Sequence, residues 1–157
     1  MENQEILFQA IRNEELETVK KVLKEEPALL NIKDRRGSTP LLLATYYGNK
    51  EITDYLLEQK PVIDEKDMSG NTALMGVCFK GFEEIAVKLI KTGANVNETN
   101  YNGATALIYA VSFNRPNLVR ILLENGADLT VKDSNGNTAE AHAKIQGLKE
   151  IAELVAL

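Results

Sequence analysis

Apolar residues recur along this chain with the spacing of an α-helix. A Leu-Val pair at 118–119 is followed four residues later by a Leu-Leu pair at 122–123, which places all four side chains on one helix face. Near the N-terminus, Leu16, Val19 and the Val-Leu pair at 22–23 show the same spacing, with glutamates and lysines at most positions between them. The pattern predicts short amphipathic helices, each with one face that must be covered.

A nine-residue segment occurs four times at a fixed period. It reads RGSTPLLLA at 36–44, SGNTALMGV at 69–77, NGATALIYA at 102–110 and NGNTAEAHA at 135–143. Its threonine stands at positions 39, 72, 105 and 138, so the copies are equally spaced along the chain. A catalytic motif is needed only once, whereas a segment copied at a fixed period is typical of the structural unit of a repeat protein.

Residues 100–132 illustrate the elements that one period is expected to form. Asn100 and Gly103 stand at the first and fourth positions of a type I turn, and the hydroxyl of Thr105 caps a first helix. This helix should end near residue 113, just before a position where three other units carry glycine, the residue favoured at a left-handed C-cap. A second helix carries the leucine stripe described above. Because two short helices cannot bury their apolar face alone, each unit needs neighbours on both sides.

These features resemble the ankyrin repeat. The shared pattern is Thr-Pro/Ala-Leu-x-x-Ala, a glycine four residues later, a Leu-Leu pair in the second helix, a closing Gly-Ala and the 33-residue period. The resemblance implies an all-α solenoid of helix-turn-helix units with β-turn or hairpin loops, forming a single domain over residues 1–157. The expected units are an N-terminal capping unit at 1–33, repeats at 34–66, 67–99 and 100–132, and a C-terminal capping repeat at 133–157.

Two positions depart from the usual ankyrin pattern. The histidine that usually follows the leucine of the motif is absent, and apolar packing is expected in place of its hydrogen bonds. The residues at that position are Leu42, Met75, Ile108 and Ala141. In the last unit Glu140 stands where earlier units carry leucine, as expected where no further repeat covers the helix.

Composition and charge are those of an ordinary globular domain. The chain has 157 residues, of which 26% are charged and 44% hydrophobic, and this length suffices for one domain with its own core. The net charge is −5 and no basic block occurs, which argues against nucleic acid as the main partner. The pair Arg35-Arg36 lies at a predicted turn and is expected to make a local contact.

The cysteine count and the absence of long apolar runs indicate a reducing compartment and no membrane. Cys78 is the only cysteine, so no intramolecular disulfide can form. The N-terminal segment lacks the apolar run of a secretory signal, and no stretch approaches the roughly 20 apolar residues of a membrane span. We therefore expect a cytoplasmic monomer.

Few residues could support catalysis or hold a cofactor. His142 is the only histidine, and its nearest carboxylate in the sequence, Glu140, lies on a different side of the predicted helix. We interpret His142 as a half-exposed residue of the terminal unit. Cys78 is equivalent to Thr45 and Val111, which predicts a buried thiol without a catalytic role. No metal site and no cofactor are predicted, because only one histidine and one cysteine exist.

Exposed variable positions point to a binding surface. In the ankyrin fold the turn tips and the exposed sides of the first helices share one concave face, and five of the nine aromatic residues fall there. Aromatic residues beside arginines are typical of protein interfaces. We treat Tyr47, Phe79 and Phe113 as one register whose rings project from one face. The predicted partner-binding residues are Arg35, Arg36, Tyr46, Tyr47, Met68, Phe79, Lys80, Tyr101 and Phe113.

The sequence favours a non-catalytic module that binds or masks another protein through this face, and it leaves two alternatives. An aromatic groove could instead hold a small molecule or a sugar. A hydrolase or transferase that used Cys78 or His142 would lack an adjacent supporting group.

Overall fold

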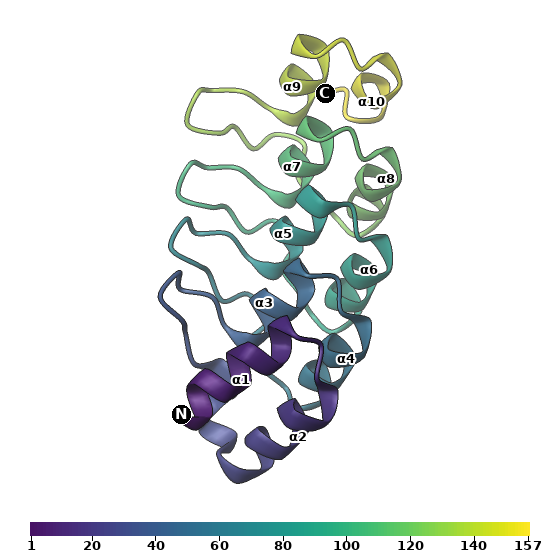
Figure 1. Ribbon diagram of the computed structural model, residues 1–157. Coiled ribbons are helices and arrows are strands. Elements are labelled where there is room, and N and C mark those ends of the chain that lie inside the picture. Colours follow the sequence, from purple (N-terminus) through teal and green to yellow (C-terminus); the bar gives the residue numbers. More distant parts are fainter.

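The computed structural model describes all residues, 1–157, and contains ten α-helices and no strand. The helices form five successive pairs, with the odd-numbered helices in one column and the even-numbered helices in a second (Figure 1). Hairpin loops project from the side of the odd-numbered column. This arrangement confirms the predicted all-α solenoid. The helices are α1 (Asn3–Arg12), α2 (Leu16–Glu25), α3 (Pro40–Tyr46), α4 (Lys50–Glu58), α5 (Ala73–Lys80), α6 (Glu83–Lys91), α7 (Ala106–Ser112), α8 (Pro116–Glu124), α9 (Ala139–Ile145) and α10 (Lys149–Leu154), with a 3-10 helix, η1 (Pro27–Asn31), after α2.

Capping residues explain where α3, α5, α7 and α9 begin and where α5 ends. The hydroxyl of each repeated threonine accepts a hydrogen bond from the backbone N–H three residues later, at 3.2 Å for Thr39 and 3.3 Å for Thr72. The same bond begins α7 and α9. Gly81 ends α5 with a φ of 86°, a left-handed conformation that glycine adopts without steric cost. The predicted threonine caps are therefore confirmed, and α7 ends with Phe113 as its C-cap, at the expected position.

The turn that opens each unit is fixed by hydrogen bonds within it and to the next unit. In residues 34–66, called the first unit below, Asp34 Oδ1 accepts from the backbone N–H groups of Arg36 and Ser38, both at 2.9 Å. The backbone N–H of Met68 then donates to the carbonyl of Arg36 at 3.2 Å. Equivalent bonds join residue 101 to 69 and residue 134 to 102, so the hairpin tips form a continuous ladder.

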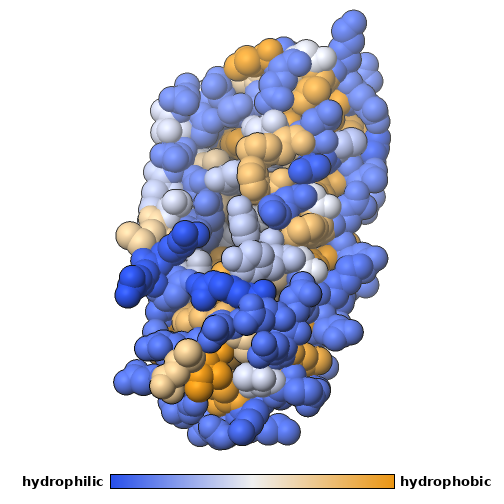
Figure 2. Space-filling view, in the orientation of Figure 1, coloured by the Kyte–Doolittle hydropathy of each residue, from blue (hydrophilic) through white to orange (hydrophobic).

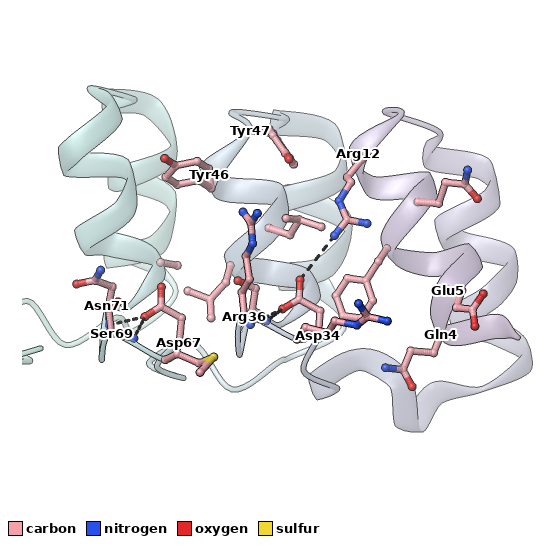
Figure 3. A pocket seen from close by; sticks show the side chains of 18 of the residues that line it. Gln4, Glu5, Arg12, Asp34, Arg36, Tyr46, Tyr47, Asp67, Ser69 and Asn71 are labelled. Carbon is pink, nitrogen blue, oxygen red and sulfur yellow. Dashed lines mark hydrogen bonds and ion pairs between the residues drawn. The ribbon is translucent and has the colours of Figure 1, made fainter. Parts of the chain in front are cut away.

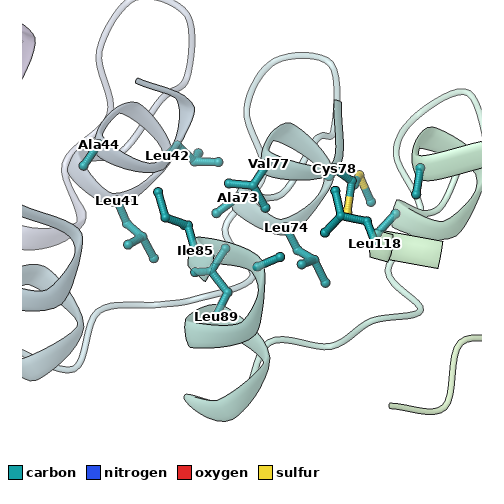
Figure 4. Close-up of a cluster of buried hydrophobic side chains, with 14 of the residues drawn as sticks. Leu41, Leu42, Ala44, Ala73, Leu74, Val77, Cys78, Ile85, Leu89 and Leu118 are labelled. Carbon is teal, nitrogen blue, oxygen red and sulfur yellow. The ribbon is translucent and has the colours of Figure 1, made fainter. Parts of the chain in front are cut away.

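One continuous apolar core runs through all five helix pairs. The leucines of the repeated motif, Leu41, Leu74 and Leu107, are buried between their own second helix and the neighbouring unit. Figure 4 shows this packing between α3, α5 and α6. Since the apolar faces of neighbouring units cover one another, stability depends on contacts between units.

Two buried threonines in the first unit differ in how their hydroxyls are satisfied. Thr45 Oγ1 donates to the carbonyl of Leu41 at 2.8 Å, whereas Thr53 Oγ1, equally buried in α4, has no hydrogen-bond partner. The equivalents of Thr53 one and two units later are Ala86 and Val119. The hydroxyl of Thr53 is thus a polar group at a repeat position where the next two units carry apolar side chains.

Ion pairs connect successive even-numbered helices on the outer side of the stack. Lys50 Nζ lies 2.6 Å from Glu84 Oε2, and Lys88 Nζ lies 2.7 Å from Asp54 Oδ1. The hydrogen bond and charge of Lys50 lower the pKa of Glu84. These ion pairs link α4 to α6 on the side of the stack away from the hairpins.

Candidate functional site

The hairpin tips and the odd-numbered helices form one face, called the concave face below, and its N-terminal half contains a groove of about 1190 Å³. The hairpin tips of the first two units form one wall, α3 and the start of α5 the floor, and α1 the opposite wall. Helix α1 has ten residues against seven in α3, and its N-terminal turn reaches toward the hairpins (Figure 1). The first helix therefore closes one end of the groove.

Polar and apolar residues are segregated on this face. Figure 2 shows a band of apolar and near-neutral residues along its middle, with hydrophilic residues at both edges. Leu42 and Leu43 of α3 line the groove together with Tyr46 and Tyr47, which are both exposed. An apolar floor with polar walls suits a segment that presents both kinds of side chain.

Most carboxylates of the groove already form hydrogen bonds or ion pairs with other groups of the chain. Asp34 and Asp67 each accept two backbone N–H groups of their own hairpin through Oδ1. Asp34 Oδ2 also lies 3.7 Å from Arg12 Nη2 (Figure 3). By contrast, the guanidinium groups of Arg35 and Arg36 are exposed and have no hydrogen bond or ion pair within the chain, so the local contact expected for this pair is not formed.

Four aromatic rings, called the aromatic row below, cross the ends of α3, α5 and α7. Tyr46 stacks on Phe79 with ring centroids 6.4 Å apart and planes inclined by 5°, and Phe79 meets Phe113 edge-on at 4.6 Å. Tyr47 contacts Tyr46 edge-on at 6.3 Å. The row is continued inward by Tyr109, which stacks on Phe113 at 6.1 Å. The rings of three units thus form one connected surface.

The register assumed for three of these rings is wrong. Tyr47 is the equivalent of Lys80 and Phe113 in the two following units, whereas Phe79 is the equivalent of Tyr46. As a result Phe79 lies between Tyr46 and Phe113 and is half buried, while those two rings are exposed. The rings meet because an odd-numbered helix ends in two adjacent outward positions, and either can reach the next unit.

Two predicted site residues are placed differently from the rest. Tyr101 is 70% exposed but stands apart from the aromatic row, covering Gly70, where a Cβ would come 2.7 Å from the backbone nitrogen of Tyr101. Lys80 does not lie free beside the rings, because its Nζ sits 4.9 Å from the centroid of Tyr46, a cation–π contact. Of the nine predicted residues, those that line the groove are Arg35, Arg36, Tyr46, Tyr47 and Met68.

Comparison with known families agrees with this architecture. The family model described as ankyrin repeats (3 copies) matches residues 7–100, 60–133 and 76–156. The chain belongs to the ankyrin-repeat family. Members of this family are generally protein–protein interaction modules and are typically non-catalytic. A search of curated proteins finds no match to the chain. No helix of this ankyrin-repeat protein has the length and apolar character needed to cross a membrane.

The single cysteine of this ankyrin-repeat protein is fully buried in α5, as predicted. Burial raises the pKa of the Cys78 thiol to about 12, because the thiolate would be desolvated among apolar side chains. The thiol is therefore protonated at neutral pH and lacks the nucleophilic form.

The environment of His142 differs from the expected one. Its Nε2 lies 2.6 Å from Asp133 Oδ2, and the side chain is about one-fifth exposed. Glu140, the carboxylate nearest to His142 in the sequence, instead pairs with Lys144 at 3.4 Å. Asp133 lies in the turn that opens the same unit, and the fold brings its side chain next to α9. No hydroxyl or thiol is hydrogen-bonded to the His142 ring, and no three His, Cys, Asp or Glu side chains converge as a metal site.

The sequence prediction missed the contribution of α1 to the groove. This ankyrin-repeat protein places Gln4, Glu5, Gln9, Arg12 and Asn13 on the wall opposite the hairpins. The signal was present, because the apolar pairs at 6–7 and 10–11 have helical spacing and imply an outward face between them. The repeat period did not indicate that α1 borders the groove, because the N-terminal helix pair lacks the repeated motif.

Proposed function

We propose that this ankyrin-repeat protein is a non-catalytic module that binds or masks a partner protein through its concave face. The observation that carries the proposal is the aromatic row, in which Tyr46, Tyr47 and Phe113 remain 43–48% exposed beside an open groove. Exposed rings grouped in one patch are characteristic of interfaces. Burying them against a partner would remove apolar surface from water.

The mechanism would be steric, because the concave face is already formed in the free protein. The helices beneath it share one core, and the hairpin tips are joined by backbone hydrogen bonds. A surface fixed in this way loses little conformational entropy on binding. The partner's own site would be occluded while it occupies the face. We further propose that the protein acts in the cytoplasm, as a monomer, and that nucleic acid is not its main partner.

The size of the groove favours a protein segment over a small molecule or a sugar. Its volume of about 1190 Å³ lies above the range of roughly 300–1,000 Å³ typical of small-ligand pockets. The aromatic row also extends beyond the groove onto α7, a longer surface than a small ligand would cover.

The proposal is tested by replacing the three exposed rings together, Tyr46→Ser, Tyr47→Ser and Phe113→Ser. Phe79 is left in place because it is half buried. We expect that partner capture from a native lysate is lost, while the helical circular dichroism spectrum and cooperative thermal unfolding are retained. Undiminished capture by the folded variant would show that the partner uses another face.

A further inference from the structure

We propose that the groove in the N-terminal half of the concave face binds an acidic, extended segment of the partner protein, with its carboxylates over Arg35 and Arg36. This inference rests on the proposed function and adds the chemistry of the segment that occupies the groove. It is carried by the distribution of unsatisfied charge and of unpaired amides around the groove.

The two arginines without a partner stand next to each other at the tip of the first hairpin. Of the five arginines, Arg12 faces Asp34, Arg115 donates to the carbonyls of Phe79 and Lys80, and Arg120 pairs with Glu150. Only Arg35 and Arg36 lack any partner for their guanidinium groups, although the chain as a whole has a net charge of −5. Two adjacent free arginines at the edge of a groove are available to an anion that comes from outside the chain.

The backbone beneath these arginines is held in place. The N–H of Arg36 donates to Asp34 Oδ1 at 2.9 Å, and its carbonyl accepts from Met68 at 3.2 Å. Figure 3 shows the side chain of Arg36 extending from the hairpin toward Tyr46 and Tyr47. A guanidinium group presents paired N–H donors that match the two oxygens of a carboxylate. The hairpin therefore offers a fixed base for charge-assisted hydrogen bonds.

The opposite wall suits the backbone of an extended chain. Gln4 and Gln9 of α1, and Asn13 directly after it, line the groove, and none of their amides is hydrogen-bonded within the chain. An amide side chain both donates and accepts, so it can pair with the free N–H and C=O groups of an extended segment. A helix would already use these groups internally. The apolar floor at Leu43, Tyr46 and Tyr47 would hold an apolar side chain of the same segment.

The charge pattern favours a carboxylate-bearing peptide over nucleic acid. Binding to a phosphate backbone depends on many neutralised phosphates, and the groove offers only two free arginines. Glu5, on the α1 wall, has no ion pair or hydrogen bond and would repel a second line of negative charge. The acidic residues should therefore lie at the hairpin side of the groove only.

The test selects peptides of about 12 random residues by phage display on the full chain, a length suited to an extended segment in a groove. One selected peptide is then labelled, and its affinity is measured by fluorescence anisotropy. The test variant is Arg35→Glu with Arg36→Glu. The control is Lys21→Glu with Lys24→Glu, two exposed, unpaired lysines of α2 outside the groove, which changes the net charge by the same amount.

We expect the selected peptides to be rich in Asp and Glu and to bind more weakly at higher salt. The arginine variant should lose roughly tenfold or more in affinity, and the lysine variant should differ by less than about twofold. Glu5→Gln should bind the same peptide more tightly than the unmodified protein. Arg35→Gln with Arg36→Gln should give an intermediate loss, which separates missing attraction from introduced repulsion.

Several results would overturn the inference. They are failure to select any peptide, selection of neutral or basic peptides, equal affinity of the arginine variant, or equally strong competition by single-stranded DNA. Peptides that lose affinity for the Tyr46, Tyr47 and Phe113 variant, but not for the arginine variant, would leave the proposed face standing and reject its charge preference.

Discussion

At the scale of single residues, two of the buried threonines of the first unit, Thr45 and Thr53, give a direct test of hydrogen-bond satisfaction. A buried hydroxyl without a partner costs about 1–3 kcal/mol. Thr53→Val removes the unpaired hydroxyl of α4 at nearly constant volume, so we expect the free energy of unfolding to rise by about 1 kcal/mol. Urea unfolding followed by circular dichroism measures the change.

Thr45→Val is the matched control. Its hydroxyl donates to the carbonyls of Leu41 and Leu42, so the same substitution should lower the free energy of unfolding by about 1 kcal/mol. Equal effects of the two substitutions would mean that helix propensity, and not hydroxyl satisfaction, determines the outcome.

At the scale of helices and turns, Asp133 makes the stability of the folded state depend on pH. Burial raises the pKa of Asp133, but hydrogen bonds from the backbone N–H groups of Asn137 and Asn135 and with His142 outweigh it, so the pKa lies below its ordinary value of 3.8. A carboxyl group with a lowered pKa in the folded state contributes stability above that ordinary value. The contribution is lost as pH falls through the folded pKa.

Asp133→Asn is expected to weaken the loss of stability between neutral pH and about pH 3. The amide keeps the acceptor for the turn, as Asn100 shows in the third unit, where its Oδ1 accepts from residues 102 and 104. The measurement compares urea midpoints of the two proteins at both pH values. An unchanged acid dependence in the variant would assign the effect to other carboxylates.

The helices and turns were predictable because their signals are local and repeated. Thr105 specifies a helix cap, Gly103 a turn and the leucine stripe a buried helix face, each within a few residues. The groove was less predictable, since its walls come from α1 and from the hairpins of two different units. The pairing of His142 with Asp133 and the half-buried position of Phe79 likewise depend on how elements pack, which residue spacing does not encode.

At the scale of the whole molecule, an interior leucine should matter far more than its terminal equivalent. Leu107 is 1% exposed between neighbouring units, so Leu107→Ala should lower the free energy of unfolding by roughly 2–5 kcal/mol. Glu140→Ala, at the equivalent position of the last unit, removes a partly exposed side chain and should cost less than about 0.5 kcal/mol. Urea unfolding checks both, and similar losses would contradict stabilisation by neighbouring units.

The ladder that joins the hairpin tips also bears on how such a protein changes length during evolution. The donors at residues 68, 101 and 134 and the acceptors at 36, 69 and 102 recur at the same interval, one repeat apart. A tandem duplication of residues 67–99 would therefore insert a unit whose tip bonds to both neighbours with the existing geometry. Arg35, Arg36 and α1 would keep their surroundings, while the concave face gained one more row of side chains for selection to vary.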